Sequence, residues 1–210
     1  MNAAEAAMAG IFGSKGSGGG GANFTFSVDG KFQYPEEVVV PNTVTSLQST
    51  SLLGFNGHTE HFKVSFEPNS VITSIPQQAF RYSGITELVL PESITSIGSY
   101  AWSGCSKLKK LVLNSICTIA NQSSSVANPF SGCTVLEDIQ IPQNWTNDLY
   151  ISSGLGFTNV LTHDSMVAMI ANLYDYTGDT AHSLTLGATN LARLSEEEKA
   201  IATAKNWTLA

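Results

Sequence analysis

Charged residues are scarce in this sequence. Lys, Arg, Asp and Glu together make up 13% of the 210 residues, roughly half of the usual share in soluble proteins. The formal net charge is −7. The basic cluster Lys107, Lys109 and Lys110 lacks the interleaved aromatic side chains of a nucleic-acid-binding stripe. The composition therefore argues against nucleic acid as a partner. It suits a surface that packs against copies of itself or contacts neutral polar ligands such as glycans.

Cysteine is also rare. The chain has three cysteines, and an odd number argues against a framework of disulfides. Cys105 and Cys133 each end a Ser-Gly-Cys tripeptide, which predicts a buried turn where a small apolar side chain fits. A disulfide between the two would need favourable geometry.

Long apolar runs are missing. No stretch approaches the roughly 20 apolar residues of a membrane span, and residues 1–12 lack the basic start of a signal peptide. We therefore expect no membrane span. Export would then occur by lysis, by virion assembly, or through a signal that this sequence does not contain.

Catalytic motifs are lacking as well. The sequence has no Ser/His/Asp order, nucleophile elbow or phosphate-binding loop. The densest group of ligand-type side chains is His58-Thr59-Glu60-His61, whose spacing differs from the helical HExxH zinc motif. We interpret this group as a polar loop rather than a metal site. The prediction is a protein that is not an enzyme, with no catalytic residues, no metal and no cofactor.

What the sequence does contain is a repeat of about 23 residues, in three successive units that span 68–90, 91–113 and 114–141. Leu88-Val89-Leu90 alternates, which predicts a strand with both leucines pointing inward. A unit this short cannot bury its apolar face alone, so the period predicts a solenoid in which neighbouring units cover one another. A solenoid offers an extended surface rather than an enclosed catalytic pocket.

The N-terminal part, residues 1–22, is predicted to be a flexible, glycine-rich appendage. Gly13–Ala22 has the composition of a flexible linker. The short apolar segment before it, with Ile11 and Phe12, would anchor the chain to an assembly. A disordered tail without a function is the alternative.

Residues 23–40 are predicted to form an N-terminal β cap. Asp29-Gly30 is a hairpin signal between the alternating segments Phe24–Val28 and Lys31–Tyr34. Such a hairpin would cover the open end of the solenoid. The repeats of the solenoid would then occupy residues 41–142, beginning with a degenerate unit.

Residues 143–210 are predicted to be β–α repeats that continue the solenoid and then cap it. Asp164 is expected to cap the first helix, and Ser195 with Glu198 forms a capping box for the second. The expected elements are a strand at 159–162, a helix at 164–176, a strand at 183–187, a helix at 195–205 and a strand at 207–209.

Exposed aromatic side chains are the best candidates for binding. Tyr82, Tyr100, Trp145 and Tyr150 are predicted to lie in loops or at turns, where an aromatic platform could stack on sugars or anchor a protein partner. The alternative is that these side chains pack over the flanks of the solenoid.

The unit PESITSIGSYAWSGCSKLKKLVL, residues 91–113, resembles the BspA-type leucine-rich repeat, which runs roughly I-P-x-x-V-T-x-I-G-x-x-A-F-x-G-C-x-x-L-x-x-I. Trp102 stands in place of the usual Phe, and residues 68–90 lack the Gly-Cys step. The resemblance implies an α/β solenoid with short parallel strands. It says little about function.

The C-terminal stretch, residues 184–210, resembles the ends of leucine-rich repeat proteins encoded by phages and prophages of Gram-positive gut bacteria. This implies a structural or binding protein of the virion, in the tail or tail fibre, with its repeat face displayed toward a host surface. The expected partners are other virion proteins, copies of itself, or a host surface protein or glycan. The alternative is a bacterial cell-surface adhesin that binds protein or glycan ligands.

Overall fold

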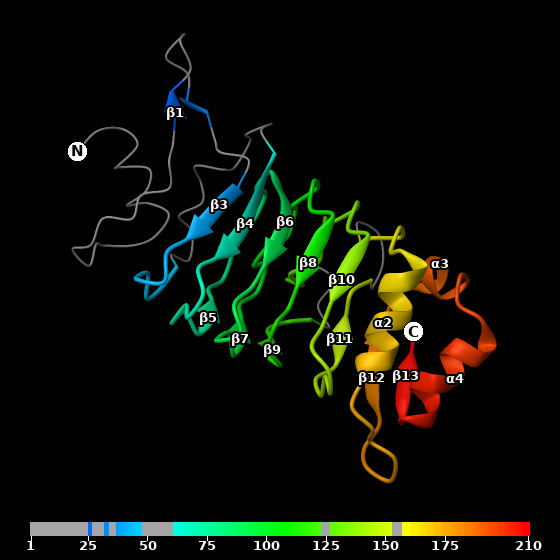
Figure 1. Ribbon diagram of the computed structural model, residues 1–210. Helices are drawn as coiled ribbons and strands as arrows, with labels where there is room; N and C mark the ends of the chain where they lie inside the picture. Colours follow the sequence, from blue (N-terminus) through cyan, green and yellow to red (C-terminus); the bar gives the residue numbers. More distant parts are fainter. Residues whose placement is uncertain (1–24, 27–31, 34–36, 48–60, 123–126, 153–156) are drawn as a thin grey trace.

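The computed structural model describes residues 25–26, 32–33, 37–47, 61–122, 127–152 and 157–210, and for 25–26 and 32–33 it describes the backbone alone. Figure 1 shows a solenoid in which the strands succeed one another from the N-terminal to the C-terminal side. None of the helices among the described residues is long and apolar enough to cross a membrane.

Five parallel strands form the main sheet, in the order β10-β8-β6-β4-β3. Each coil contributes one strand, and equivalent residues lie opposite one another, so that Leu111 pairs with Leu88 on one side and with Ile139 on the other. All three side chains are buried, which confirms the predicted repeat and its inward alternation. The strands are β3 (Glu37–Val40), β4 (Phe62–Phe66), β6 (Ile85–Val89), β8 (Lys110–Val112) and β10 (Asp138–Gln140). The first of these, β3, falls within the segment that the sequence assigns to the N-terminal cap.

A second parallel sheet, β5-β7-β9, forms the other side of the coils. Its strands are β5 (Ser74–Ile75), β7 (Ser96–Ile97) and β9 (Thr118–Ile119), and their isoleucines are buried. Between the coils Trp102 meets Phe130 edge to face, with ring centroids 5.6 Å apart. A Cβ atom on Gly98 would lie 2.5 Å from the backbone nitrogen of Gln77, so neighbouring coils approach closely there because residue 98 is glycine.

The predicted N-terminal hairpin is present as an antiparallel pair. β1 (Thr25–Phe26) pairs with β2 (Phe32–Gln33), with Phe26 opposite Phe32. Its role as a cap stays a prediction. The anchor residues Ile11 and Phe12 lie outside the described residues, as do His58, Thr59 and Glu60 of the polar loop.

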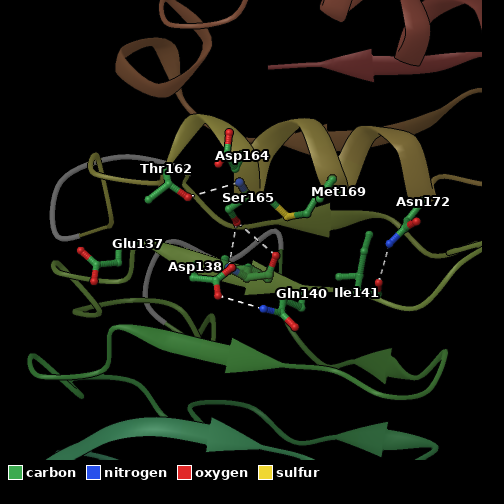
Figure 2. A pocket seen from close by; sticks show the side chains of 11 residues that line it. Glu137, Asp138, Gln140, Ile141, Thr162, Asp164, Ser165, Met169 and Asn172 are labelled. Atoms are coloured by element: carbon green, nitrogen blue, oxygen red, sulfur yellow. Dashed lines mark hydrogen bonds between the residues drawn. The ribbon is translucent and has the colours of Figure 1, made fainter.

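The main sheet ends where a helix replaces its sixth strand (Figure 2). The backbone N–H of Thr162 donates to Glu137 O at 2.7 Å, as a sixth strand would. The chain then turns into α2 (His163–Asn172), and the Ser165 hydroxyl bonds both the N–H of Ile139, at 2.9 Å, and its carbonyl, at 3.1 Å. The strand predicted at 159–162 is therefore wrong, because a side chain takes over the hydrogen bonds at the edge of β10.

The predicted limits of this helix are also wrong. Thr162, rather than Asp164, is the N-cap, and its side chain accepts from the N–H of Ser165. Asp164 points away from β10 in Figure 2 and is fully exposed. The helix ends at Asn172 because Leu173 becomes extended and forms a parallel bridge with Trp145.

A third parallel sheet closes the C-terminal part, in the order β11-β12-β13. Ser195 and Glu198 form the predicted capping box at the start of the last helix. At the end of that helix Lys205 Nζ donates to the carbonyls of Ala171, at 2.7 Å, and Leu173, at 2.9 Å, at the C-terminus of α2. The elements are β11 (Leu149–Tyr150), β12 (His182–Thr185), α3 (Ala188–Leu191), α4 (Glu196–Ala204) and β13 (Trp207–Leu209).

Candidate binding site

The outward face of the main sheet carries a ladder of alternating charge. Pairing of the five strands places Glu37, Lys63, Glu87, Lys110 and Asp138 side by side in one row. Lys63 Nζ lies 3.1 Å from Glu87, and Lys110 Nζ lies 3.7 Å from Glu87 and 3.9 Å from Asp138. Such partly exposed pairs contribute about 0.2–1 kcal/mol each. The row therefore organises the face while its charges largely neutralise one another.

A different surface is formed by the turns that connect the two sheets. The turn between β5 and β6 holds Arg81 and Tyr82, and the next turn, between β7 and β8, holds Tyr100. The guanidinium carbon of Arg81 lies 4.6 Å from the ring centroid of Tyr82 and 4.5 Å from that of Tyr100. The structure thus brings together two of the four predicted aromatic residues around a cation. Stacking of this kind contributes about 0.5–1 kcal/mol at exposed sites.

Arg81 is incompletely partnered. One Nη donates to the Tyr82 hydroxyl at 2.9 Å, whereas the Nε atom is buried without a hydrogen-bond acceptor. Within the described part of the chain no carboxylate lies in ion-pair distance of this guanidinium. A guanidinium has five N–H donors and no acceptor, so this side chain keeps a net positive charge and spare donors at a turn that faces solvent.

Both tyrosines have an unusual backbone conformation. The φ angles of Tyr82 and Tyr100 are both 57°, in the left-handed region that bulky residues rarely adopt. Tyr82 is 47% exposed and its ring lies against Gly104, where a Cβ atom would come within 2.1 Å of Tyr82 Cδ1. Backbone strain of this kind persists only where the surrounding structure fixes it. At Tyr100 the turn itself does so, because Gln78 at the equivalent step of the preceding coil has a φ of 61°.

The other two predicted aromatic residues do not join this cluster. Trp145 is fully buried, so the prediction that it is exposed is wrong. Its backbone bridges Leu173, and its Nε1 donates to Asn147 O at 2.5 Å, which holds the indole inside the C-terminal junction. Tyr150 is half-buried in β11, paired with Thr185, and lies in a different part of the solenoid.

Arg81 was missed because a single arginine carries no signal by itself. Alignment of the repeat units provides the signal, because Arg81-Tyr82 occupies the place of Ser103-Gly104 in the next unit. The two pairs are equivalent in the structure, because each makes the same backbone hydrogen bond to the following coil. Tyr82 N–H donates to Ser103 O at 2.9 Å, and Gly104 N–H donates to Ser131 O at 2.7 Å.

The groove between β10 and α2 in Figure 2 has a volume of roughly 600 Å³. Its polar groups serve the fold. Ser165 satisfies the edge of β10, Asn172 donates to Ile141 O at 2.8 Å, and Asp138 accepts from Gln140 at 2.9 Å. We interpret the groove as the junction that ends the main sheet.

The cysteines are buried and unpaired, as the sequence predicts for Cys105 and Cys133. Cys105 Sγ donates to Phe80 O at 2.9 Å and Cys133 Sγ to Trp102 O at 3.3 Å, so the thiols fill equivalent places in successive coils. Burial raises the pKa of Cys105 to about 11 and that of Cys117 to about 12, and raises the pKa of Cys133 well above its usual value. Thiols with such pKa values are poor nucleophiles at neutral pH. Among the described residues no group of His, Cys, Asp and Glu could hold a metal ion.

Three comparisons relate the chain to known proteins. No curated protein matches it. The crystal structure of the pneumococcal vaccine antigen PcpA is similar over 56% of this chain, with 28% sequence identity and a TM-score of 0.39, and this chain spans 28% of that one. The family model of the BspA type leucine rich repeat region matches residues 31–149 in six copies. Because this match covers more than half of the 210 residues, the chain belongs to the BspA-type leucine-rich repeat family.

Proposed function

We propose that this chain is a non-enzymatic binding and structural protein of a phage particle, located in the tail or tail fibre. The observation that carries the binding role is the ordered outward face of the solenoid, where five parallel strands present a single row of alternating charges. Stacked repeats create extended surfaces of this kind, and such surfaces serve as binding faces.

The location in a virion has separate support. Residues 184–210 resemble the ends of phage-encoded leucine-rich repeat proteins, and in the fold this stretch contains the end of β12 followed by α3, α4 and β13. The partners on this proposal are other virion proteins or copies of the chain, attached through residues 1–22, and a host surface protein or glycan at the displayed face.

Particle incorporation tests the proposal. Particles are purified from a host that produces the phage encoding this chain, and mass spectrometry measures the chain in particles with the full sequence and in particles whose version starts at Asn23. We expect the full chain in the particles and loss of the shortened one, with unchanged circular dichroism of the shortened protein. Equal incorporation of both would contradict the anchoring role, and absence of the full chain from particles would contradict the virion location.

A bacterial cell-surface adhesin is the second candidate. The cluster of Arg81, Tyr82 and Tyr100 favours it, since an exposed aromatic ring next to an unpaired cation suits a protein or glycan ligand. An antibody against the solenoid separates the two functions. Labelling of intact, uninduced bacteria supports the adhesin, whereas labelling confined to released particles supports the virion protein.

A further inference from the structure

The turn that holds Arg81 and Tyr82 departs from its neighbours in side chains but not in backbone. Successive coils place Tyr82, Gly104 and Gly132 at the same step, with φ angles of 57°, 77° and 79°. Glycine adopts this conformation freely, whereas tyrosine does so at a cost in free energy. The coil that leads into β6 therefore keeps the turn but has Arg-Tyr where the next two coils have Ser-Gly.

This replacement creates a chemical environment that the next two turns lack. Tyr82 contributes an exposed aromatic ring and a hydroxyl that accepts from Arg81 at 2.9 Å, which leaves the hydroxyl proton available to a ligand. Arg81 contributes a planar cation with spare donors, held within 4.5 Å of the Tyr100 ring centroid. The two rings restrict the guanidinium, so little conformational freedom is lost when a ligand binds it.

We propose that Arg81, Tyr82 and Tyr100 form a binding site for a carboxylate-bearing sugar, such as a uronic acid residue of an acidic glycan. The guanidinium and the Tyr82 hydroxyl donate to the carboxylate, because planar N–H donors match its two oxygens. The part of the Tyr82 ring that Arg81 and Gly104 leave exposed packs against the apolar C–H groups of the sugar. A neutral sugar leaves the cation unpaired, and a simple anion makes no use of the ring.

The charge distribution of the chain makes the site selective. The whole protein carries a net charge of −7, which disfavours anions in general. The lysines of the sheet face are already paired with carboxylates, as Lys63 is with Glu87 at 3.1 Å. Arg81 therefore provides a local cation in an acidic molecule, and only a ligand that also gains from the aromatic ring binds well there.

Titration calorimetry with the full chain tests the site. The probes are a hexasaccharide of alternating glucuronate and N-acetylglucosamine, the neutral hexamer of N-acetylglucosamine, and sodium acetate. We expect the acidic hexasaccharide to bind more tightly than either of the others. The proposal would be overturned if the acidic hexasaccharide did not bind. It would also be overturned if the neutral hexamer or acetate bound as tightly as the acidic hexasaccharide does.

Variants locate the binding on the structure. Arg81→Ser combined with Tyr82→Gly restores the Ser-Gly of the neighbouring turns, so it removes the site while it keeps the backbone. We expect the affinity for the acidic hexasaccharide to fall about tenfold or more, because the variant loses at least one charge-assisted hydrogen bond to the ligand. Lys199→Gln, which removes one positive charge from α4, is the matched control and should bind as the wild type does. Unchanged binding by the double variant, with its circular dichroism also unchanged, would overturn the assignment.

This inference rests on the proposed binding role, but the two fail separately. A chain that enters particles and does not bind the acidic sugar keeps its proposed function and loses this site. A chain that binds the acidic sugar through Arg81 and never enters particles keeps the site and loses the virion location.

Discussion

Replacement of Ser165 by alanine should destabilise the protein far more than an ordinary Ser→Ala change. The Ser165 side chain is buried, and its hydroxyl bonds both the N–H and the carbonyl of Ile139 at the edge of β10. Alanine leaves two buried backbone groups without partners. Each such group costs about 1–3 kcal/mol, so we expect a loss of about 2–4 kcal/mol in the free energy of unfolding, with partial relief through water that enters the adjoining groove.

Urea denaturation followed by tryptophan fluorescence measures this loss. With a urea dependence of about 2–3 kcal/mol per molar, the transition should move down by roughly 1 M. Ser106→Ala is the control: Ser106 is exposed, and its loss should change stability by less than about 0.5 kcal/mol. Hydrogen exchange at the Ile139 amide should accelerate in Ser165→Ala. Similar transitions for the two variants, with unchanged exchange at Ile139, would refute the view that a side chain closes the edge of the sheet.

Three further predictions concern the turns, the thiols and the last helix. Gly104→Ala should destabilise the protein by about 1–2 kcal/mol, because residue 104 has a left-handed φ of 77° that alanine adopts at a cost. The added methyl group should also displace the Tyr82 ring and shift its NMR signals. Unmoved signals would contradict the contact. The cysteines should resist Ellman's reagent at pH 8 and react fully in denaturant, because burial raises their pKa values; fast reaction in the folded state would contradict this burial. The N–H of Ser195 lowers the pKa of Glu198 in the folded protein, so its contribution is present above the unfolded pKa and is lost as the pH falls through the folded one. Glu198→Gln should therefore be less stable than the wild type at pH 7, and the difference should shrink only as the pH falls below the ordinary carboxyl pKa and through the lowered folded one. A difference in thermal unfolding that stays constant down to strongly acidic pH would contradict the assignment.

The repeat could be predicted from the sequence because its signal is local and periodic. Leu88, Leu111 and Ile139 recur at the same step of successive units, although the third unit is longer than the other two. Each of these side chains needs the neighbouring coil to be buried, so the repeat that is visible in the sequence also identifies the core. The capping box of Ser195 and Glu198 was predictable for a related reason: both partners lie within one turn of helix.

The end of the main sheet could not be predicted in the same way. Residues 159–162 read as a strand, and one ladder bond does form at the last of them, from Thr162 N–H to Glu137 O. The outcome depends on Ser165, whose hydroxyl substitutes for backbone groups of the strand at Ile139, 26 residues earlier. Hydrophobic alternation carries no information about such a substitution.

Of the four aromatic candidates Tyr82 is exposed, Tyr100 and Tyr150 are half-buried and Trp145 is buried, and the reason lies in long-range pairing. Trp145 and Tyr82 both read as aromatic residues in loops, but Trp145 bridges Leu173 and is buried whereas Tyr82 lies on Gly104 and stays exposed. The contact of Arg81 with Tyr100 arises because consecutive coils place these turns side by side. It becomes visible in the sequence only when the units are aligned and the residues at the Ser-Gly step are compared.

In a stacked solenoid, stability and recognition can be assigned to different parts of each unit. Side chains that point inward must suit the coil on each side, and their replacement affects the whole stack. The Ser-Gly step is held by backbone hydrogen bonds, from Tyr82 to Ser103 O and from Gly104 to Ser131 O, so its side chains can change while the ladder persists. One coil has accepted a strained tyrosine and an unpaired arginine there. Because glycine at that step relieves the strain, Tyr82→Gly should make the protein more stable while it weakens the binding of the acidic sugar, and a residue that acts only in packing cannot produce these opposite effects.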